Sequence, residues 1–136
     1  GVGLENSAIR TVGKEGGSFS VGRFTLTFVP SVHVRLPLVA SLIINKTIPT
    51  VLTPPAHLLS FKDGGTFSLL ISHPDGSVLV HASPNYIPHA LDHLSADVVF
   101  LGLPPIGGGA NKSEWLRGYY QHVVKATGAK AVVPCH

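Results

Sequence analysis

Apolar segments that run into polar side chains are the most constraining feature of this chain of 136 residues. His33, Ser83 and His136 each follow an apolar, strand-like segment, and these segments are far apart in the sequence. In open α/β sheets, ligands collect at the carboxyl ends of the strands. Imidazoles that reach this edge from distant segments are typical zinc ligands. The pattern therefore predicts a metal site at one edge of a sheet, with histidines as its ligands.

Two β-hairpins are predicted before residue 82, because short glycine-containing turns join alternating apolar runs. The predicted elements are strands at 18–21, 24–29, 66–72 and 77–81, with turns at 22–23 and 73–76. Pro-Asp-Gly in the second turn is a strong signal, since Pro restricts φ and Gly accepts positive φ. Between the hairpins several prolines interrupt the pattern, and residues 38–44 are compatible with a short strand or a short helix.

Strands and helices alternate in the last third of the chain. Ile87, Leu91 and Leu94 have helical spacing behind Pro88, which predicts a short helix. The continuous apolar run at 97–103 predicts a strand that is buried on both faces.

A second helix is predicted from a cap at Ser113 to about Thr127, with Gly128 beyond its end. Gly118 lies inside this helix, where glycine costs about 1 kcal/mol relative to alanine. The expected apolar stripe is Leu116, Tyr120, Val123 and Thr127, flanked by Trp115 and Tyr119. A final strand is predicted at 131–134. Helices between strands imply crossover connections and parallel neighbours, so the ends of these strands are expected at one edge.

The composition points to a chain with a missing partner. Charged residues make up 12% of the sequence, against about 25% in typical soluble domains, and the mean hydropathy is +0.32. Such a chain has either a large partner interface or is half of a larger domain. Lys and Arg are dispersed, and the apolar runs are far shorter than the about 18 residues of a membrane helix, so neither nucleic acid nor membrane is expected as a partner. The single cysteine excludes an internal disulfide, and the compartment stays open, with the cytoplasm as the default expectation.

Four stretches of the chain, in order, resemble motifs of the metallo-β-lactamase superfamily. Residues 28–33 resemble its third metal motif, 64–83 the hairpin before its fourth, 97–108 the strand and glycine loop after it, and 132–136 its fifth motif. The likeness covers nearly the whole chain and is closest to lactonase-like and phosphodiesterase-like members. It implies an α/β fold in which the chain forms half of an αββα sandwich, with a mixed sheet of hairpins followed by strand-helix alternation.

The chain departs from the superfamily pattern at two places. The signature His-x-His-x-Asp-His, which precedes the third motif, does not occur in this sequence. We therefore expect residues 1–136 to be a single domain that forms the carboxyl-terminal half of a larger metallo-hydrolase domain. Ser83 stands where the superfamily has an aspartate that bridges two metals, and a neutral hydroxyl is a poor ligand for such cations. One zinc ion, a weak second ion or no metal all stay open.

The resemblance implies a metal-dependent hydrolase that uses metal-activated water on a small ester, lactone or phosphodiester-type substrate. His33 would hold the first metal, His136 the second, and Ser83 would face the shared position. The missing amino-terminal half, or a second chain, would supply the remaining ligands. The alternative is a non-catalytic module that kept the fold for partner binding after losing metal ligands. Possible pocket residues are His81, Asn85, Gly107 and Gly108, of which the first two are also candidates to replace the lost aspartate.

Other side chains have a chemical interpretation that the sequence does not favour. Cys135 neighbours His136, but adjacent strand residues point to opposite faces, so a small buried apolar role is favoured over a thiol nucleophile. Ser83 lacks the glycine-flanked elbow of a nucleophilic serine. His89 and His93, at i and i+4, could chelate a metal on one helix face, although a solvated surface is favoured.

Overall fold

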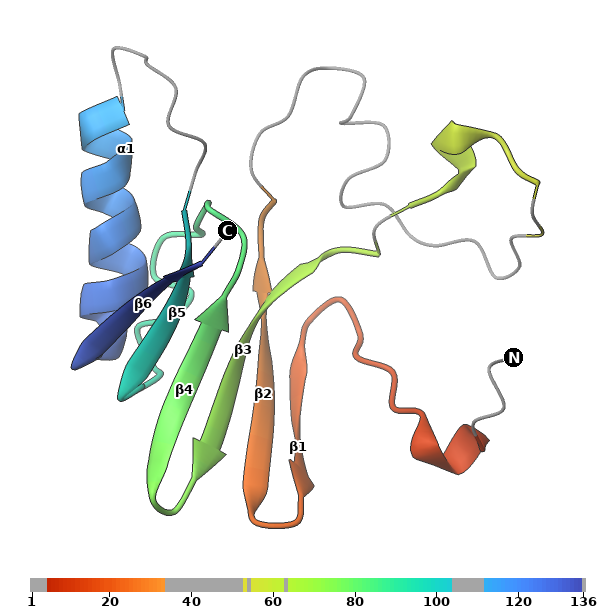
Figure 1. The fold of residues 1–136 in the computed structure, drawn as a ribbon, viewed down its shortest axis with the longest axis horizontal. Coiled ribbons are helices and arrows are strands. Elements are labelled where there is room, and N and C mark those ends of the chain that lie inside the picture. Colours follow the sequence, from red (N-terminus) through yellow and green to blue (C-terminus); the bar gives the residue numbers. More distant parts are fainter. Residues whose placement is uncertain (1–4, 34–52, 54, 63, 104–111, 136) are drawn as a thin grey trace.

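The computed structural model describes residues 5–33, 53, 55–62, 64–103 and 112–135, which form a six-stranded sheet with a helix packed on it (Figure 1). Two short 3-10 turns, η1 (Asn6–Ala8) and η3 (Leu58–Ser60), lie outside the sheet. The helix consists of α1 (Lys112–Tyr119) and its π-helical continuation η4 (Tyr120–Lys125). The strands are β1 (Gly17–Val21), β2 (Phe24–Ser31), β3 (Thr66–His73), β4 (Gly76–His81), β5 (Val98–Gly102) and β6 (Ala131–Cys135).

The six strands lie side by side in sequence order. β1 to β4 are antiparallel neighbours, whereas β4, β5 and β6 are parallel. Since β2 and β4 both run antiparallel to β3, the strands β2, β4, β5 and β6 all point the same way, and their carboxyl ends meet at the upper edge of the sheet in Figure 1. The predicted α/β class and the predicted mixed sheet are confirmed at this level.

Both predicted hairpins are present in the expected places. Val21 pairs with Phe24 across the first turn, and His73 pairs with Gly76 across the second. β2 runs further than predicted, to Ser31, and so includes Pro30. The described part of β1 reaches only the partner of Phe28, so Pro30 lies in a stretch that β1 does not cover, where a strand tolerates a residue without an N–H.

The helix predicted behind Pro88 is wrong, because the segment consists of turns. Backbone bonds join Ala90 to Ile87 and Leu94 to Leu91, at 3.2 and 3.0 Å. His89 has a φ of 65°, in the left-handed region, which a right-handed helix cannot include. The apolar residues instead anchor these turns to the core, in which Leu91 is buried.

The second helix is confirmed in extent, with Gly128 at a φ of 65° just beyond it. The helix begins at Lys112, so Ser113 lies inside its first turn. The predicted stripe is partly wrong, because Leu116 and Tyr120 are exposed whereas Tyr119 is buried. Packing explains the glycine at position 118, since a Cβ on Gly118 would collide with the Tyr86 hydroxyl.

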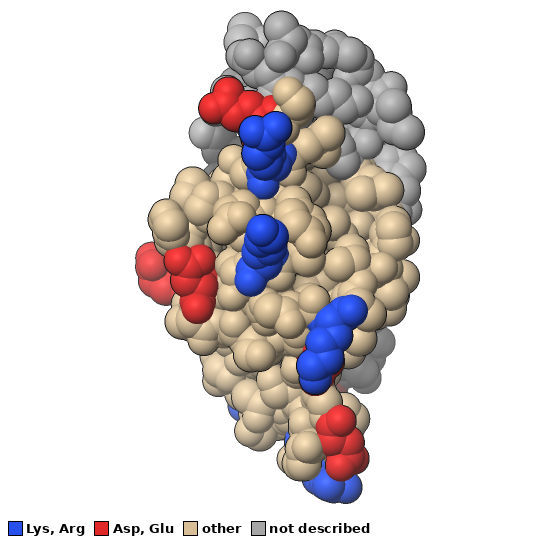
Figure 2. All heavy atoms as spheres, turned by 90° about the vertical axis from the view of Figure 1, so that its left-hand side faces the viewer, with Lys and Arg blue, Asp and Glu red and all other residues tan. Residues whose placement is uncertain are grey.

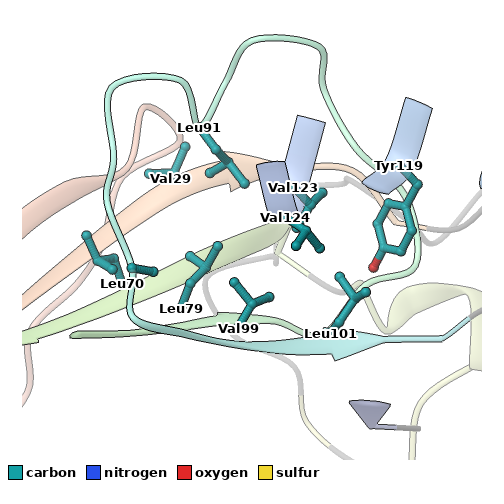
Figure 3. Close-up of a cluster of buried hydrophobic side chains, with 10 residues drawn as sticks. Val29, Leu70, Leu79, Leu91, Val99, Leu101, Tyr119, Val123 and Val124 are labelled. Carbon is teal, nitrogen blue, oxygen red and sulfur yellow. The ribbon is translucent and has the colours of Figure 1, made fainter. Parts of the chain in front are cut away.

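One face of the sheet, called here the covered face, carries the core. The helix and the segment 82–97 pack on it, and Leu79, Val99 and Val123 are each 0% exposed. Figure 3 shows these side chains between the sheet and the helix. The other core members are Val29, Leu70, Leu91, Ala96, Leu101, Tyr119 and Val124.

The opposite face, called here the open face, is also apolar but holds no buried side chain among the described strand residues before β6. Strand alternation and register place on it Phe24, Leu26, Phe28, Phe67, Leu69, Ile71, Val78, Val80, Val98 and Phe100. Phe100 is 38% exposed, so the prediction that β5 is buried on both faces is wrong. No described helix covers this face (Figure 1).

Charges are sparse on the outer surface of the helix side. Figure 2 views the molecule from the side of α1 and β6, where single cationic and anionic residues lie among a larger uncharged surface. In the part of the chain that the structure describes, no helix combines the length and the apolar character that crossing a bilayer requires. The low charge of the chain goes together with an apolar sheet face that no described helix covers.

Candidate functional site

The predicted site edge brings together two segments that are distant in sequence. His33 lies two residues beyond β2, and Ser83 lies two residues beyond β4, with β3 between these strands. Strands two places apart in a sheet are separated by about 10 Å. The Ser83 hydroxyl nevertheless donates to the carbonyl of Val32, at 2.8 Å. The segments therefore leave their strands and converge over the start of β3, as the prediction of a shared edge requires.

Asn85 makes the second link between these segments. Its Nδ2 donates to the carbonyl of His33, at 3.0 Å, and its Oδ1 accepts from the backbone N–H of Tyr86. The backbone N–H of Asn85 donates to the carbonyl of Ser83, at 2.8 Å. The predicted pocket residue Asn85 thus positions the backbone that carries His33, whose side chain is partly buried.

Ser83 acts as a structural tie at the edge. Its side chain is almost fully buried, and its one hydroxyl proton is directed to the Val32 carbonyl. A carbonyl oxygen cannot remove that proton, whereas a nucleophilic serine needs a base beside it. The geometry therefore gives Ser83 a neutral, hydrogen-bonded role next to His33 and adds no negative charge there.

His81 is a core residue and not a free ligand. Its side chain is 2% exposed, Nε2 lies 2.7 Å from the carbonyl of Asn85, and Nδ1 lies 2.7 Å from the hydroxyl of Ser68. A carbonyl only accepts, so Nε2 carries the proton and Nδ1 accepts from Ser68. Burial lowers the pKa of His81 below its ordinary value, which keeps the ring neutral. Both nitrogens are engaged, so His81 does not replace the missing aspartate in this arrangement.

Tyr119 places a polar group at the edge of the sheet, which the sequence does not predict. Its hydroxyl donates to the carbonyl of Gly102 at the end of β5, at 2.7 Å, and burial raises its pKa. Gly102 is required there, since a Cβ would collide with the carbonyl of Ala82. A tyrosine one position beside an apolar helix stripe was the available signal, but the stripe was placed on the wrong residues.

The end of β6 reaches the same edge. Cys135 pairs in register with Gly102, and its carbonyl accepts from the backbone N–H of Leu103, at 2.9 Å. Cys135 is partly buried, whereas the sequence favours a small buried apolar role. The predicted ligand His136 and the predicted pocket residues Gly107 and Gly108 lie outside the described residues.

A separate group of potential ligands lies between the segment 82–97 and the helix. His89, Asp92 and His122 each offer one ligand atom, and these atoms lie within 4.8 Å of one another. Chelation by His89 and His93, which the sequence allows but does not favour, does not occur, because the segment is not a helix and His89 pairs with Asp92 instead. Only the fold reveals the contribution of His122, which is 33 residues from His89.

Asp97 occupies the opposite edge of the sheet, at the start of β5. Its carboxylate accepts from Lys130 Nζ and from the backbone N–H of Ser77, both at 2.8 Å. Lys130 and then Ser77 hold the pKa of this carboxyl below its ordinary value. Asp97 therefore joins β4, β5 and the start of β6, remote from His33.

Comparisons with known proteins do not assign this geometry to a family. No protein-family model matches the sequence, and neither a curated protein nor a solved structure matches the chain. The resemblance to the metallo-β-lactamase superfamily thus stays a prediction that depends on the order of its motifs.

Proposed function

We propose that this chain is the carboxyl-terminal half of a metallo-β-lactamase-like hydrolase, in which His33 and His136 bind zinc. The observation that carries the proposal is the convergence of the segments after β2 and β4, recorded by the bond from Ser83 to Val32. β5 and β6 end at the same edge as these strands. Such an edge is where α/β proteins bind ligands.

The open face supports the proposal that a second half packs on this sheet. Its side chains are mostly apolar, and the described ones on β2 to β5 are at least partly exposed. Two sheets that pack face to face bury the apolar residues of both inner faces. An amino-terminal half, or a second chain, would thereby cover the open face and supply the His-x-His-x-Asp-His ligands that this sequence lacks.

The chemistry of the described groups fits one metal better than a bridged pair. The imidazole of His33 is a suitable zinc ligand, and Asn85 holds its backbone. Ser83 offers a neutral oxygen whose proton is committed to Val32, so it cannot act as a bridging carboxylate. When bound, zinc would lower the pKa of water and polarise a scissile carbonyl or phosphoryl group. The expected substrate is a small ester, lactone or phosphodiester.

The second candidate is a partner-binding module without catalysis. Ser83 at the bridging position favours it, as does the uncovered apolar face. In that case the open face would still bind a partner, although the metal site has been lost. The two candidates differ in metal content and in hydrolysis, and both can be measured on the same protein.

The test compares zinc content in the full-length protein with zinc content in His33→Ala and His136→Ala. Asp92→Asn is included in every sample to weaken the separate His89, Asp92 and His122 group, and His57→Ala is the matched control. We expect each of the two predicted ligand substitutions to lower bound zinc and hydrolysis of a nitrophenyl ester or phosphodiester, while the control keeps both. Unchanged zinc in both variants would remove the metal proposal and leave the binding module.

A further inference from the structure

Two imidazoles and a carboxylate from separate segments meet on the helix side of the molecule. His89 and Asp92 belong to the turns between β4 and β5, and His122 belongs to η4. Nδ1 of His89 lies 2.7 Å from Oδ2 of Asp92, and one ligand atom from each of the three residues falls within 4.8 Å of the others. This group shares no residue with the edge that carries His33.

The ring of His122 is held in place by its neighbours. It stacks on Tyr86 with ring centres 5.2 Å apart and 17° between the planes, and it meets the ring of His89 edge-on at 4.9 Å. Tyr86 is itself packed against the core. The π-helical turn η4 is a rare form that is frequently found at functional sites. His122 is therefore preorganised on a fixed platform, whereas His89 and Asp92 are exposed to solvent.

We propose that His89, Asp92 and His122 form a binding site for a divalent transition-metal ion, with zinc as the expected occupant. Two imidazoles and one carboxylate are a common set of three zinc ligands that leaves a fourth position for water. Zinc places such ligand atoms about 2.0–2.2 Å from the ion, so neighbouring ligand atoms lie about 3.3 Å apart. The 2.7 Å contact between His89 and Asp92 would open slightly, and these two exposed side chains would move toward His122.

Zinc would replace one long contact as well as the 2.7 Å contact between His89 and Asp92. The backbone N–H of His89 donates to Nδ1 of His122 at 3.4 Å, which is long for a hydrogen bond. Zinc on Nδ1 would use this lone pair, and zinc on Nε2 would require a proton on Nδ1, so the bond is lost in either case. The side chains of His89 and Asp92 are 75% and 51% exposed, which gives the ion a direct path from solvent.

The site would join two parts of the fold that are otherwise held together by packing and a few hydrogen bonds, such as that from the Ala96 N–H to the Thr127 carbonyl at 3.1 Å. An ion between His122 and the other two ligands would cross-link the helix to the segment 82–97. Because zinc would bind the folded chain and not an unfolded one with separated ligands, its binding would raise the unfolding temperature. Thermal stabilisation by zinc is therefore a second readout besides affinity.

The experiment titrates zinc into the full-length protein that carries His33→Ala and His136→Ala, so that the proposed hydrolase site does not contribute. In this background we expect one saturable zinc site by calorimetry, an absorption band when cobalt replaces zinc, and a higher unfolding temperature. His122→Ala should abolish all three, and His89→Asn and Asp92→Asn should weaken binding by at least about tenfold, which even the loss of an outer contact to a metal can cause.

The controls separate loss of ligand from loss of fold. His93→Ala removes an exposed histidine beside the cluster and should leave the zinc affinity unchanged. His89→Asn suits the left-handed backbone at this position, and Asp92 is exposed, so these variants are expected to fold even if His122→Ala does not. Zinc affinity that is unaffected by His89→Asn and Asp92→Asn, or a background protein with no saturable zinc site, would overturn the proposal. Neither result bears on His33 and His136, which are already removed.

Discussion

The two faces of the sheet are both built from apolar residues, but their side chains are buried to different extents. On the covered face Val99 is 0% exposed, whereas its neighbour Phe100 on the open face is 38% exposed. The alternation of the strands directs successive side chains to opposite faces. What separates these neighbours is therefore the presence of the helix and the segment 82–97 on one side. Apolar residues mark a face that can be buried, and packing decides which face is.

The faces also differ in the burial of their polar side chains. The covered face includes Ser68 and His81, which are bonded to each other and almost completely buried. The open face carries His73, which lies against the ring of Phe24 and next to the exposed Asp75. Burial makes the first pair sensitive to protonation, and the following experiments use this contrast.

The largest effect is expected from truncation in the covered face. Leu79→Ala removes a side chain that is 0% exposed and should lower the unfolding free energy by about 2–5 kcal/mol, because it leaves a cavity. The matched change on the open face is Leu69→Ala, whose side chain is only partly buried. Urea unfolding of both variants measures the difference. Equal losses would mean that the two faces are packed alike.

A substitution that should stabilise an ordinary helix is expected to destabilise this one. Gly118→Ala gains about 1 kcal/mol from helix propensity, but the new Cβ would collide with Tyr86, and overpacking costs about 1–3 kcal/mol. We expect a net loss in the unfolding free energy. In a Tyr86→Leu background the same substitution should become neutral or favourable. A gain in the unaltered background would show that Tyr86 does not pack tightly on the covered side.

Acidification should destabilise the covered face through His81. Burial lowers the pKa of His81 below its ordinary value of 6.5, so the unfolded chain binds a proton that the folded chain resists. The stabilisation from the neutral ring is complete above pH 6.5 and is lost as the pH falls from there through the folded-state pKa. Asp97 acts in another window, because its pKa is lowered from 3.8 and its stabilisation disappears only below that value.

The check is urea unfolding above and below the ordinary histidine pKa. The unaltered protein should lose unfolding free energy on acidification, and His81→Gln should lose less. His73→Gln, on the open face, is the matched control and should keep the pH dependence of the unaltered protein. If His81→Gln and His73→Gln behave alike, the buried ring is not the source of the effect.

The smallest effect is expected on the open face itself. Phe100→Ala should change the unfolding free energy by less than about 1 kcal/mol, close to the range of surface positions. Addition of the proposed partner half should make the same substitution more costly, because Phe100 would then be buried. Urea unfolding of this chain alone and with the partner measures both values. A loss comparable to that of Leu79→Ala in the isolated chain would show that the face is already covered.

Local signals in the sequence were sufficient for the sheet and its turns. Gly22-Arg23 and Pro74-Asp75 connect the hairpins where their turn chemistry predicted, and Gly128 ends the helix with a positive φ. These features depend on residues that are close in sequence. The spacing of Ile87 and Leu91 does not distinguish a helix from turns, because apolar residues four positions apart can anchor a series of turns as well as a helix.

The candidate site could be predicted only in outline. The sequence predicts Ser83 at the end of β4, and His33 joins it only if the first hairpin lies beside that sheet. The antiparallel pairing of β2 with β3 meets this condition in the structure. The sequence did not show that Ser83 donates to Val32, nor that both nitrogens of His81 are engaged. Such partners lie many residues away, and the hydrogen-bond pattern depends on how the loops bend beyond their strands.

The amino-acid sequence by itself determined the two hairpins and the end of the helix, because short-range turn chemistry and apolar alternation set them. The pairing of β2 with β3, which brings His33 and Ser83 to one edge, depends on contacts across a long connection. Tertiary structure decided which apolar face is covered, that His81 belongs to the core, and that His122 joins His89 and Asp92. Burial and ligand geometry are properties of groups brought together from distant segments. No local sequence pattern predicts the distance between two such groups.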